Sequence, residues 1–292
     1  MKAAPFAYHA PETVDDVAGL LAAHGDEAKI LAGGQSLIPL LALRLARFGH
    51  LVDINRVPEL SGVTSENGWV RVAAGTRHRV MERDATVAGR VPLLTRATPL
   101  VGHFQIRNRG TVGGALAHAD PAAEYPAVAL ALEASLEVRG PSGPREIPAA
   151  EFFVGTWTTS MEPDELLVAA RFPTWEGRCG FAVEELARRH GDFAIVGAVC
   201  GVRVDEAGVV DKAALGFFGV GATPIRAGDA EAALIGRQGR VTAVDLAEIA
   251  RLATRELAPS DDLHATGEYR RELASVLTER ALTRALSEAT DG

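Results

Sequence analysis

Two short glycine pairs, each beside a side-chain hydroxyl, constrain this chain more than any other feature. The first pair lies in residues 32–37 (AGGQSL) and the second in residues 111–115 (TVGGA). Glycine lacks a Cβ, so its backbone can adopt φ > 0 and can let an anion approach N–H groups closely. Ser36 and Thr111 each add a hydroxyl donor. Two such segments, each running into an apolar helix-like stretch, predict a diphosphate held from two sides.

The residues around the glycine pairs predict regular elements that would present them. Thr13 and Gly25 mark the start and end of one helix. A short strand over residues 29–32 ends at the first pair, and Ser36 is expected to cap a helix over residues 37–43. Further strands are predicted at 51–54, 69–73, 136–138 and 166–172, and helices at 93–101 and from Pro121 onward.

The second part of the chain predicts a separate, smaller domain. Residues 173–180 contain Pro173, Gly177 and Gly180 and form a plausible boundary. Strands follow at 194–204 and 213–220, and helices at 230–235, 243–257 and 267–286. Strands followed by helices indicate an α+β arrangement.

Composition limits the function classes. The 292 residues carry a formal net charge of −8 and contain no dense basic patch, which argues against a nucleic-acid partner. Two cysteines, Cys179 and Cys200, cannot supply the four ligands of an iron–sulfur cluster. No apolar stretch is long enough to be a transmembrane segment, and no signal peptide is evident, so we expect a cytoplasmic protein.

Residues 118–124 (HADPAAE) combine a histidine with two carboxylates. Asp120 precedes Pro121 and could be an N-cap, or a carboxylate here could bind ribose or ribityl hydroxyls. Glu124 lies four residues later and could share its helix face or be a solvated surface group. A metal at His118 is disfavoured because no second His or Cys lies at ligand spacing.

Two other segments allow both a structural and a functional interpretation. Residues 105–111 form a polar, basic approach to the second pair, with Arg107 and Arg109 as expected exposed donors. Residues 188–193 form either an exposed turn or a cover that stacks Phe193 on a flat cofactor. Rossmann, Walker and serine-elbow motifs are missing from the sequence. The residues alone therefore predict a diphosphate-containing cofactor.

Several segments together resemble the FAD-binding medium subunit of the molybdenum hydroxylases, the family of xanthine dehydrogenase and carbon-monoxide dehydrogenase. The matching segments are residues 29–37, 105–114, 117–124, 188–194, 221–226 and 268–271. The resemblance covers nearly the whole chain. It implies an α+β fold with a two-lobed FAD-binding domain of the vanillyl-alcohol-oxidase type at residues 1–175, whose lobes are about 1–55 and 56–175. A smaller α+β domain like the carbon-monoxide-dehydrogenase flavoprotein C-terminal domain would follow at residues 176–292.

The resemblance also implies which residues bind FAD. Residues 29–36 and 111–115 would wrap the diphosphate, Glu124 would contact the cofactor, and Leu167 would contact it by backbone and packing. Phe193 stands where several relatives carry a tyrosine near the isoalloxazine. The candidate cofactor-binding residues are Lys29, Ile30, Leu31, Ala32, Gly33, Gly34, Gln35, Ser36, Leu37, Ile106, Thr111, Gly113, Gly114, Ala115, Asp120, Glu124, Leu167 and Phe193. No catalytic residue and no metal ligand is assigned.

Three positions depart from the family pattern. Ala115 replaces a frequent asparagine, Phe193 lacks the phenol hydroxyl, and Glu184 stands where some relatives carry a lysine. The last two leave the electron acceptor open. FAD is expected to be non-covalent because the two glycine segments contain no His, Cys or Tyr.

The function implied is that of the FAD subunit of a heterotrimeric molybdenum hydroxylase. A small iron–sulfur subunit with 2Fe-2S clusters would deliver electrons from a large molybdopterin subunit that carries the molybdenum cofactor, and FAD would pass them to an external acceptor. The assembly would be a dimer of heterotrimers. Two alternatives are a stand-alone FAD-linked oxidoreductase and a non-catalytic assembly subunit that has lost FAD.

Overall fold

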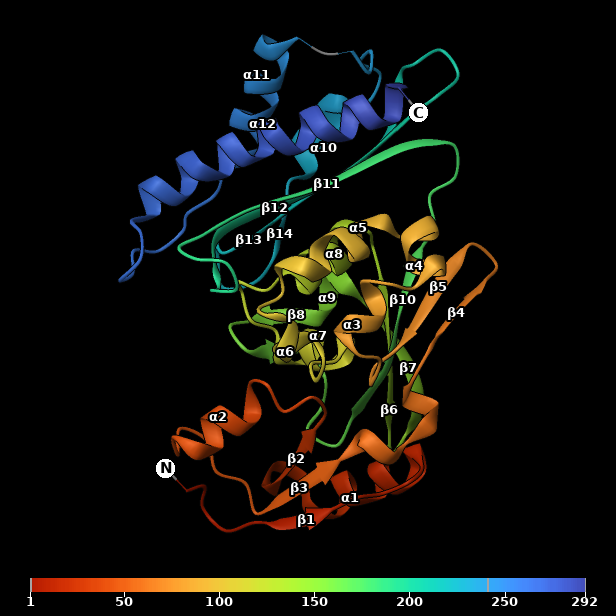
Figure 1. Ribbon diagram of the computed structural model, residues 1–292, viewed down its shortest axis with the longest axis vertical. Coiled ribbons are helices and arrows are strands. Elements are labelled where there is room, and N and C mark those ends of the chain that lie inside the picture. Colours follow the sequence, from red (N-terminus) through yellow and green to blue (C-terminus); the bar gives the residue numbers. More distant parts are fainter. Residues whose placement is uncertain (1, 241, 292) are drawn as a thin grey trace.

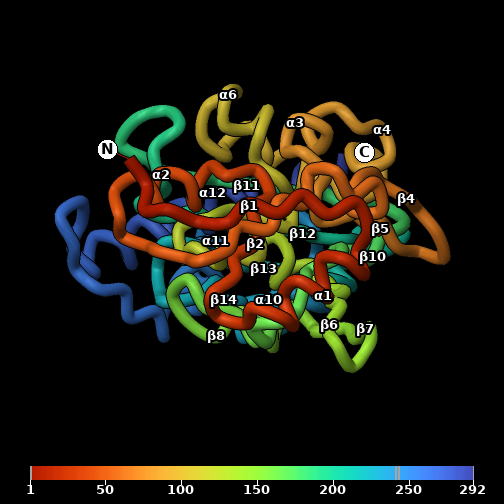
Figure 2. Tube along the Cα trace, turned by 90° about the horizontal axis from the view of Figure 1, so that it is seen from below, coloured from red at the N-terminus to blue at the C-terminus, as the bar shows by residue number. Residues whose placement is uncertain are grey.

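The computed structural model describes residues 2–240 and 242–291 and shows three parts in sequence order along the long axis of the molecule. The N-terminal lobe, in red, lies at one end of Figure 1 and the long C-terminal helix at the other. Viewed from below in Figure 2, the N-terminal lobe extends across the end of the molecule. The mixed helix and sheet content agrees with the α+β class predicted from the sequence.

The N-terminal lobe is a three-stranded parallel sheet with one covering helix. Its strand order is β1-β3-β2, and both outer strands run parallel to β3. Val17 and Leu21 of the helix pack with Val52 of the central strand. The elements are β1 (Ala7–His9), α1 (Val14–His24), η1 (Gly25–Glu27), β2 (Ala28–Leu31), α2 (Leu37–Ala42), β3 (His50–Asp53), η2 (Ile54–Arg56) and η3 (Pro58–Leu60).

The parallel pairing of β2 and β3 determines where this lobe can bind a ligand. Strands that run in the same direction end at the same edge of the sheet. The first glycine turn after β2 therefore meets Asp53, at the end of β3, and Asn55 just after it. Asn55 confirms the proximity, since its Nδ2 donates to the Ala32 carbonyl at 2.9 Å.

The central lobe is built on a five-stranded antiparallel sheet in the order β4-β5-β10-β6-β7. Its strands are β4 (Val63–Glu66), β5 (Trp69–Ala73), β6 (Ser135–Gly140), β7 (Gly143–Pro148) and β10 (Leu166–Pro173), and a separate pair is β8 (Phe153–Gly155) and β9 (Thr158–Thr159). Its helices are short: α3 (His78–Met81), α4 (Ala85–Arg90), α5 (Pro92–Ala97), η4 (Thr98–Leu100), α6 (Phe104–Arg107), α7 (Val112–His118), α8 (Glu124–Ala131) and α9 (Ala149–Phe152).

The C-terminal part is a four-stranded antiparallel sheet covered on both faces. It comprises β11 (Arg178–Ala187), β12 (Ala194–Val204), β13 (Val210–Phe218), β14 (Ile225–Arg226), α10 (Gly228–Leu234), α11 (Ala243–Thr254) and α12 (Gly267–Asp291). Alternate residues of β12 face opposite sides: Val199 joins the core of the central lobe, and Cys200 joins the core under α10–α12. Arg96 of α5 donates two 2.6 Å hydrogen bonds to Glu288 of α12. These bonds link the central lobe to the C-terminal part.

The predicted elements agree with the structure in most places and differ in a few. Ser36 makes no side-chain capping bond at the start of α2, unlike Thr13, which caps α1 as predicted. The helix expected from Pro121 begins only at Glu124, and the helix expected over residues 93–101 ends at Ala97 and continues as a 3-10 turn. Strands β1, β4, β7 and β11 and the two-stranded pair β8–β9 were not predicted, nor was the short strand β14.

Candidate functional site

The first glycine turn offers a run of backbone donors that no acceptor in residues 2–240 and 242–291 uses. It occupies residues 32–36, between β2 and α2, and Gly34 has φ +73°, which favours glycine. Within the described part of the chain, the N–H groups of Gly33, Gly34, Gln35 and Ser36 have no acceptor. Consecutive free N–H groups in such a turn form a concave site for an anion.

The second glycine turn packs directly against the first. A Cβ built on Gly33 would overlap the carbonyl oxygen of Arg109 and lie 2.7 Å from the Gly110 Cα. A Cβ on Gly114 would lie 3.6 Å from the Ala32 Cβ. The structure therefore brings together two segments that are far apart in the sequence. Glycine at position 33 is therefore required by the contact between the turns, in addition to the room for a ligand that the sequence predicts.

The two turns differ in the donors they offer. In the second turn, the N–H groups of residues 112–115 already donate to the Thr76 carbonyl, the Ala74 carbonyl, the Thr111 Oγ1 and the Thr111 carbonyl. Thr111 is an N-cap whose Oγ1 accepts from Gly114. A diphosphate would thus find its backbone donors in the first turn, and the second turn would act mainly as a close-packed wall.

A cavity of about 360 Å³ opens beside the first turn. Its lining consists of the turn, the start of α2 and three polar side chains: Leu31, Ala32, Gly33, Gly34, Gln35, Ile38, Pro39, Asp53, Asn55 and Arg109. Arg109 is exposed, and no ion pair to it is found among residues 2–240 and 242–291. Free donors, a nearby arginine and glycine-permitted close packing fit a diphosphate.

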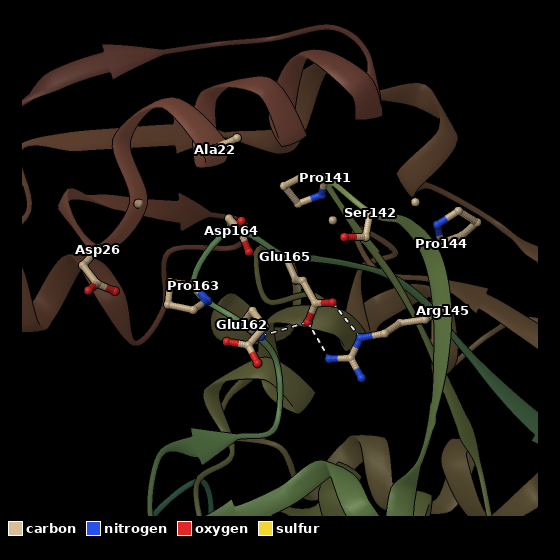
Figure 3. Close-up of a pocket in the computed structure, with 13 residues that line it drawn as sticks. Ala22, Asp26, Pro141, Ser142, Pro144, Arg145, Glu162, Pro163, Asp164 and Glu165 are labelled. Carbon is tan, nitrogen blue, oxygen red and sulfur yellow. Dashed lines mark hydrogen bonds and ion pairs between the residues drawn. The ribbon is translucent and has the colours of Figure 1, made fainter.

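A larger cavity, of about 580 Å³, does not fit an anion. It lies between the end of α1 and the β6–β7 hairpin (Figure 3). Arg145 is the cation among its lining residues, and it already donates to both carboxylate oxygens of Glu165 at 2.6 and 2.7 Å. The other charged residues there are acidic: Asp26, Glu162 and Asp164.

Arg107 is not the exposed donor expected from the sequence. It is buried, its Nε lies 3.0 Å from Glu82 Oε1, and its Nη1 donates to the Gly102 carbonyl at 2.7 Å. These bonds join α6 to the end of α3 and to the loop before α6, so Arg107 has a structural role. Of the two arginines, only Arg109 can reach a ligand.

A buried histidine that we did not single out from the sequence supports the second turn. His78 Nε2–H donates to the Thr111 carbonyl at 2.8 Å, and its backbone N–H donates to the Gly110 carbonyl. Burial lowers the pKa of His78 to about 4, so the ring is neutral. Its edge contacts Tyr125, whose hydroxyl lies 2.7 Å from Thr98 Oγ1. An isolated histidine gives no sequence signal for this role.

Glu124 is buried at the start of α8, and burial together with the nearby Glu185 raises its pKa to about 8. Burial also raises the pKa of Glu185, on β11, to about 7, and its Oε2 has no partner among the described residues. At pH 7 Glu124 is therefore mostly protonated, and Glu185 is about half protonated. Glu185 was missed because a strand at this position was not predicted.

Asp120 does not cap α8. Its Oδ1 accepts from the Ala122 N–H at 2.9 Å, and its Oδ2 accepts from Trp157 Nε1 at 3.3 Å. These bonds fix the loop before the helix. A Cβ on Gly113 would overlap Ala74, so packing also requires glycine there.

The remaining candidate residues lie outside the lining of the 360 Å³ cavity. Leu167 is buried in β10, Ile106 is partly buried on α6, and Lys29 stands 5.8 Å from the Phe48 ring centroid. Phe193 is 71% exposed. Its loop reaches the central lobe, since a Cβ on Gly191 would touch the ring of His103. Of the predicted set, the structure places residues 31–35 in the cavity lining, and Thr111, Gly113, Gly114 and Ala115 in the adjoining turn and helix α7.

Comparison with known proteins gives matches over nearly the whole chain. Residues 4–175 match the family described as the FAD binding domain in molybdopterin dehydrogenase, and residues 181–285 match the CO dehydrogenase flavoprotein C-terminal domain. The alpha subunit of the 6-hydroxypseudooxynicotine dehydrogenase complex of Paenarthrobacter nicotinovorans is 41% identical over 99% of this chain and 97% of its own length. The carbon monoxide dehydrogenase medium chain of Hydrogenophaga pseudoflava is 38% identical over 96% of both chains.

Solved structures agree with these matches. A chain of carbon monoxide dehydrogenase from Hydrogenophaga pseudoflava superimposes with a TM-score of 0.95 and covers 99% of both chains at 38% identity. A chain of quinoline 2-oxidoreductase from Pseudomonas putida 86 superimposes with a TM-score of 0.93 and covers 99% of both chains at 36% identity. In the described part of the chain, every helix is too short or too polar to span a membrane.

Proposed function

The chain belongs to the FAD-binding family of the molybdopterin dehydrogenases, and we propose that it carries electrons from an iron–sulfur partner to an external acceptor. Membership makes it the FAD subunit of an oxidoreductase of the molybdenum hydroxylase type. The reaction on the organic substrate belongs to other subunits in this family. The task of this chain is to hold and tune the flavin.

The observation that carries the proposal is the row of four free N–H groups in the first glycine turn. We propose that the N–H groups of residues 33–36 bind the FAD diphosphate and that Arg109 adds a positive charge. His78 and Thr111 would keep the adjoining turn in place. FAD, when bound, accepts electrons and releases them to a second partner. The remaining predicted site residues, including Ile106, Leu167 and Phe193, are proposed contacts.

Glu124 is proposed to face the cofactor as a neutral carboxyl. Its raised pKa means that it can donate a hydrogen bond at neutral pH, where an ionised carboxylate could only accept one. Glu185 shares this property and lies on the C-terminal sheet. A protonated Glu124, together with the protonated fraction of Glu185, would add no negative charge beside a cofactor that gains electrons.

The proposed partners are a small iron–sulfur subunit and a large molybdopterin subunit, assembled as a dimer of heterotrimers. The names of the relatives, a medium chain and a subunit of a dehydrogenase complex, support partners of this kind. Cys200 is buried and Cys179 is partly buried, and two thiols are too few for a cluster. We further propose a division into domains at residues 1–175 and 176–292, joined through residues 174–177.

Acid precipitation of the purified chain tests the cofactor. We expect one FAD per chain in the supernatant. Flavin in the pellet would contradict non-covalent binding, and FMN would contradict a diphosphate site. A purified chain without any flavin affinity would favour the assembly-subunit alternative.

Steady-state turnover tests the need for partners. The isolated chain should not oxidise an organic substrate of the complex, whereas the complex with both partners should. Turnover by the isolated chain would instead favour a stand-alone oxidoreductase.

A further inference from the structure

Three histidines from three separate elements meet on the N-terminal lobe, away from the glycine turns. His9 ends β1, His24 ends α1, and His50 begins β3. One ring nitrogen from each lies within 4.8 Å of the others. The rings of His24 and His50 stack with centroids 3.6 Å apart, and His9 Nε2 lies 2.9 Å from His50 Nδ1.

The backbone pattern explains why these three residues meet. Side chains two residues apart on a strand share a face, so His50 lies on the same face as Val52, which packs under α1. His9 is the partner of Val52 in the parallel pairing of β1 with β3, so its side chain lies on the same face. Helix α1 packs on that face and ends at His24. The cluster therefore results from the fold, although the residues are 15 and 26 positions apart in the sequence.

The chemistry of the cluster suits a metal ion of borderline softness. Neutral imidazole is a preferred ligand of Zn²⁺, Cu²⁺ and Ni²⁺. Partial burial and the two neighbouring histidines lower the pKa of His50, which favours its neutral form. All three side chains are half-buried, so an ion from solvent can reach them.

We propose that His9, His24 and His50 form a binding site for a single Zn²⁺-like transition-metal ion. Tetrahedral Zn²⁺ with bonds of about 2.0–2.1 Å places its ligand nitrogens about 3.3 Å apart. His9 Nε2 and His50 Nδ1, which are 2.9 Å apart, would therefore separate slightly, and the His24 ring, which stacks on His50, would turn its nitrogen toward the ion. The ion would replace the proton between His9 and His50. Water or Glu27 would take the fourth position, since a Cβ built on Gly49, the residue before His50, would lie 3.0 Å from Glu27 Oε2.

A metal ion here would link β1, α1 and β3, the last of which leads to the proposed flavin site. Strand β3 leads from His50 to Asp53, which lines the 360 Å³ cavity. The ion would link this strand to β1 and to the end of α1, which are otherwise joined to it by short pairings and packing. The site is thus proposed as a structural clamp, independent of electron transfer.

The test is a Zn²⁺ titration of the full chain, free of any histidine tag and stripped with a chelator, in competition with a chromogenic chelator. We expect one Zn²⁺ per chain and at least a tenfold loss of affinity in His9→Gln, His24→Gln and His50→Gln. His264→Gln, in an exposed loop, is the matched control and should bind like the wild type.

Thermal unfolding with and without Zn²⁺ gives a second readout. Zn²⁺ should raise the Tm of the wild type and of His264→Gln, and should leave the Tm of His24→Gln unchanged. Equal Zn²⁺ affinity in the wild type and the three cluster variants would overturn the proposal, as would the lack of any tight site in the wild type. FAD content measured on the same samples reports on folding and separates this result from the proposed flavin role.

Discussion

Gly33 shows that a single residue can be required by a contact between two segments that the sequence does not reveal. The sequence indicated a glycine that leaves room for an anion. In the structure, its missing Cβ allows the backbone of Arg109 and Gly110 to pack against the first turn. The free N–H groups and the close contact are therefore two separate requirements placed on the same turn.

Gly33→Ala should weaken FAD binding by at least tenfold and lower the Tm. The added Cβ overlaps the Arg109 carbonyl, so the two turns must separate and the donors lose their alignment. Fluorescence titration of the apoprotein with FAD measures the affinity. Gly19→Ala is the control, because a Cβ at this exposed position in α1 contacts nothing within 4 Å. Wild-type FAD affinity in Gly33→Ala would mean that the contact between the turns does not shape the site.

Glu124 makes the stability of the protein depend on pH in a specific direction. Its pKa is about 8 in the folded protein, against an ordinary value of 4.5. Between these values the unfolded state releases a proton that the folded state keeps, so stability falls as pH rises, by at most about 1.4 kcal/mol per pH unit. Glu124→Gln should remove this loss and gain stability relative to the wild type from pH 5 to 8. Denaturant unfolding of the apoprotein at several pH values measures it, and parallel curves for the two proteins would contradict the burial argument.

At the scale of elements, the strand–turn–helix around the first glycine pair could be predicted because its signals are local. An apolar run, two glycines and a second apolar run are enough to place β2 and α2. The proximity of Asp53 and Asn55 could not be predicted, because it depends on the parallel pairing of β2 with β3. Strand β11 was missed since Glu184 and Glu185 interrupt its apolar pattern, and their burial arises only when α5 and α12 cover the sheet.

His78 links α3 to the second glycine turn, and its neutrality can be tested. The folded pKa of about 4 lies below the ordinary value of 6.5, so between these values the unfolded state binds more protons. Stability should therefore fall as pH drops from 6.5 to 4. His78→Gln keeps a donor for the Thr111 carbonyl and should lose this pH dependence, while FAD affinity at pH 8 changes by less than tenfold. The difference in unfolding free energy between the two proteins, followed against pH, is the measurement. A difference that is constant with pH would show that folding does not lower the pKa of His78.

At the scale of the whole molecule, the resemblance predicted the family and the α+β class, and both are confirmed by the matches over residues 4–175 and 181–285. Individual contacts were harder to predict. Arg107 was expected to be exposed and is a buried clamp, and the histidine cluster gave no sequence signal because its members come from three elements. Spacing in the sequence identifies local turns, whereas sites assembled by tertiary packing require the structure.

The most direct test of the central claim is a crystal structure of the chain with FAD bound. We predict that diphosphate oxygens lie within hydrogen-bond distance, about 2.7–3.2 Å, of the N–H groups of Gly33, Gly34, Gln35 and Ser36. The Arg109 guanidinium should lie beside the same phosphates. A diphosphate held instead by the 580 Å³ cavity around Arg145, or one that leaves the first glycine turn without a ligand, would contradict the account.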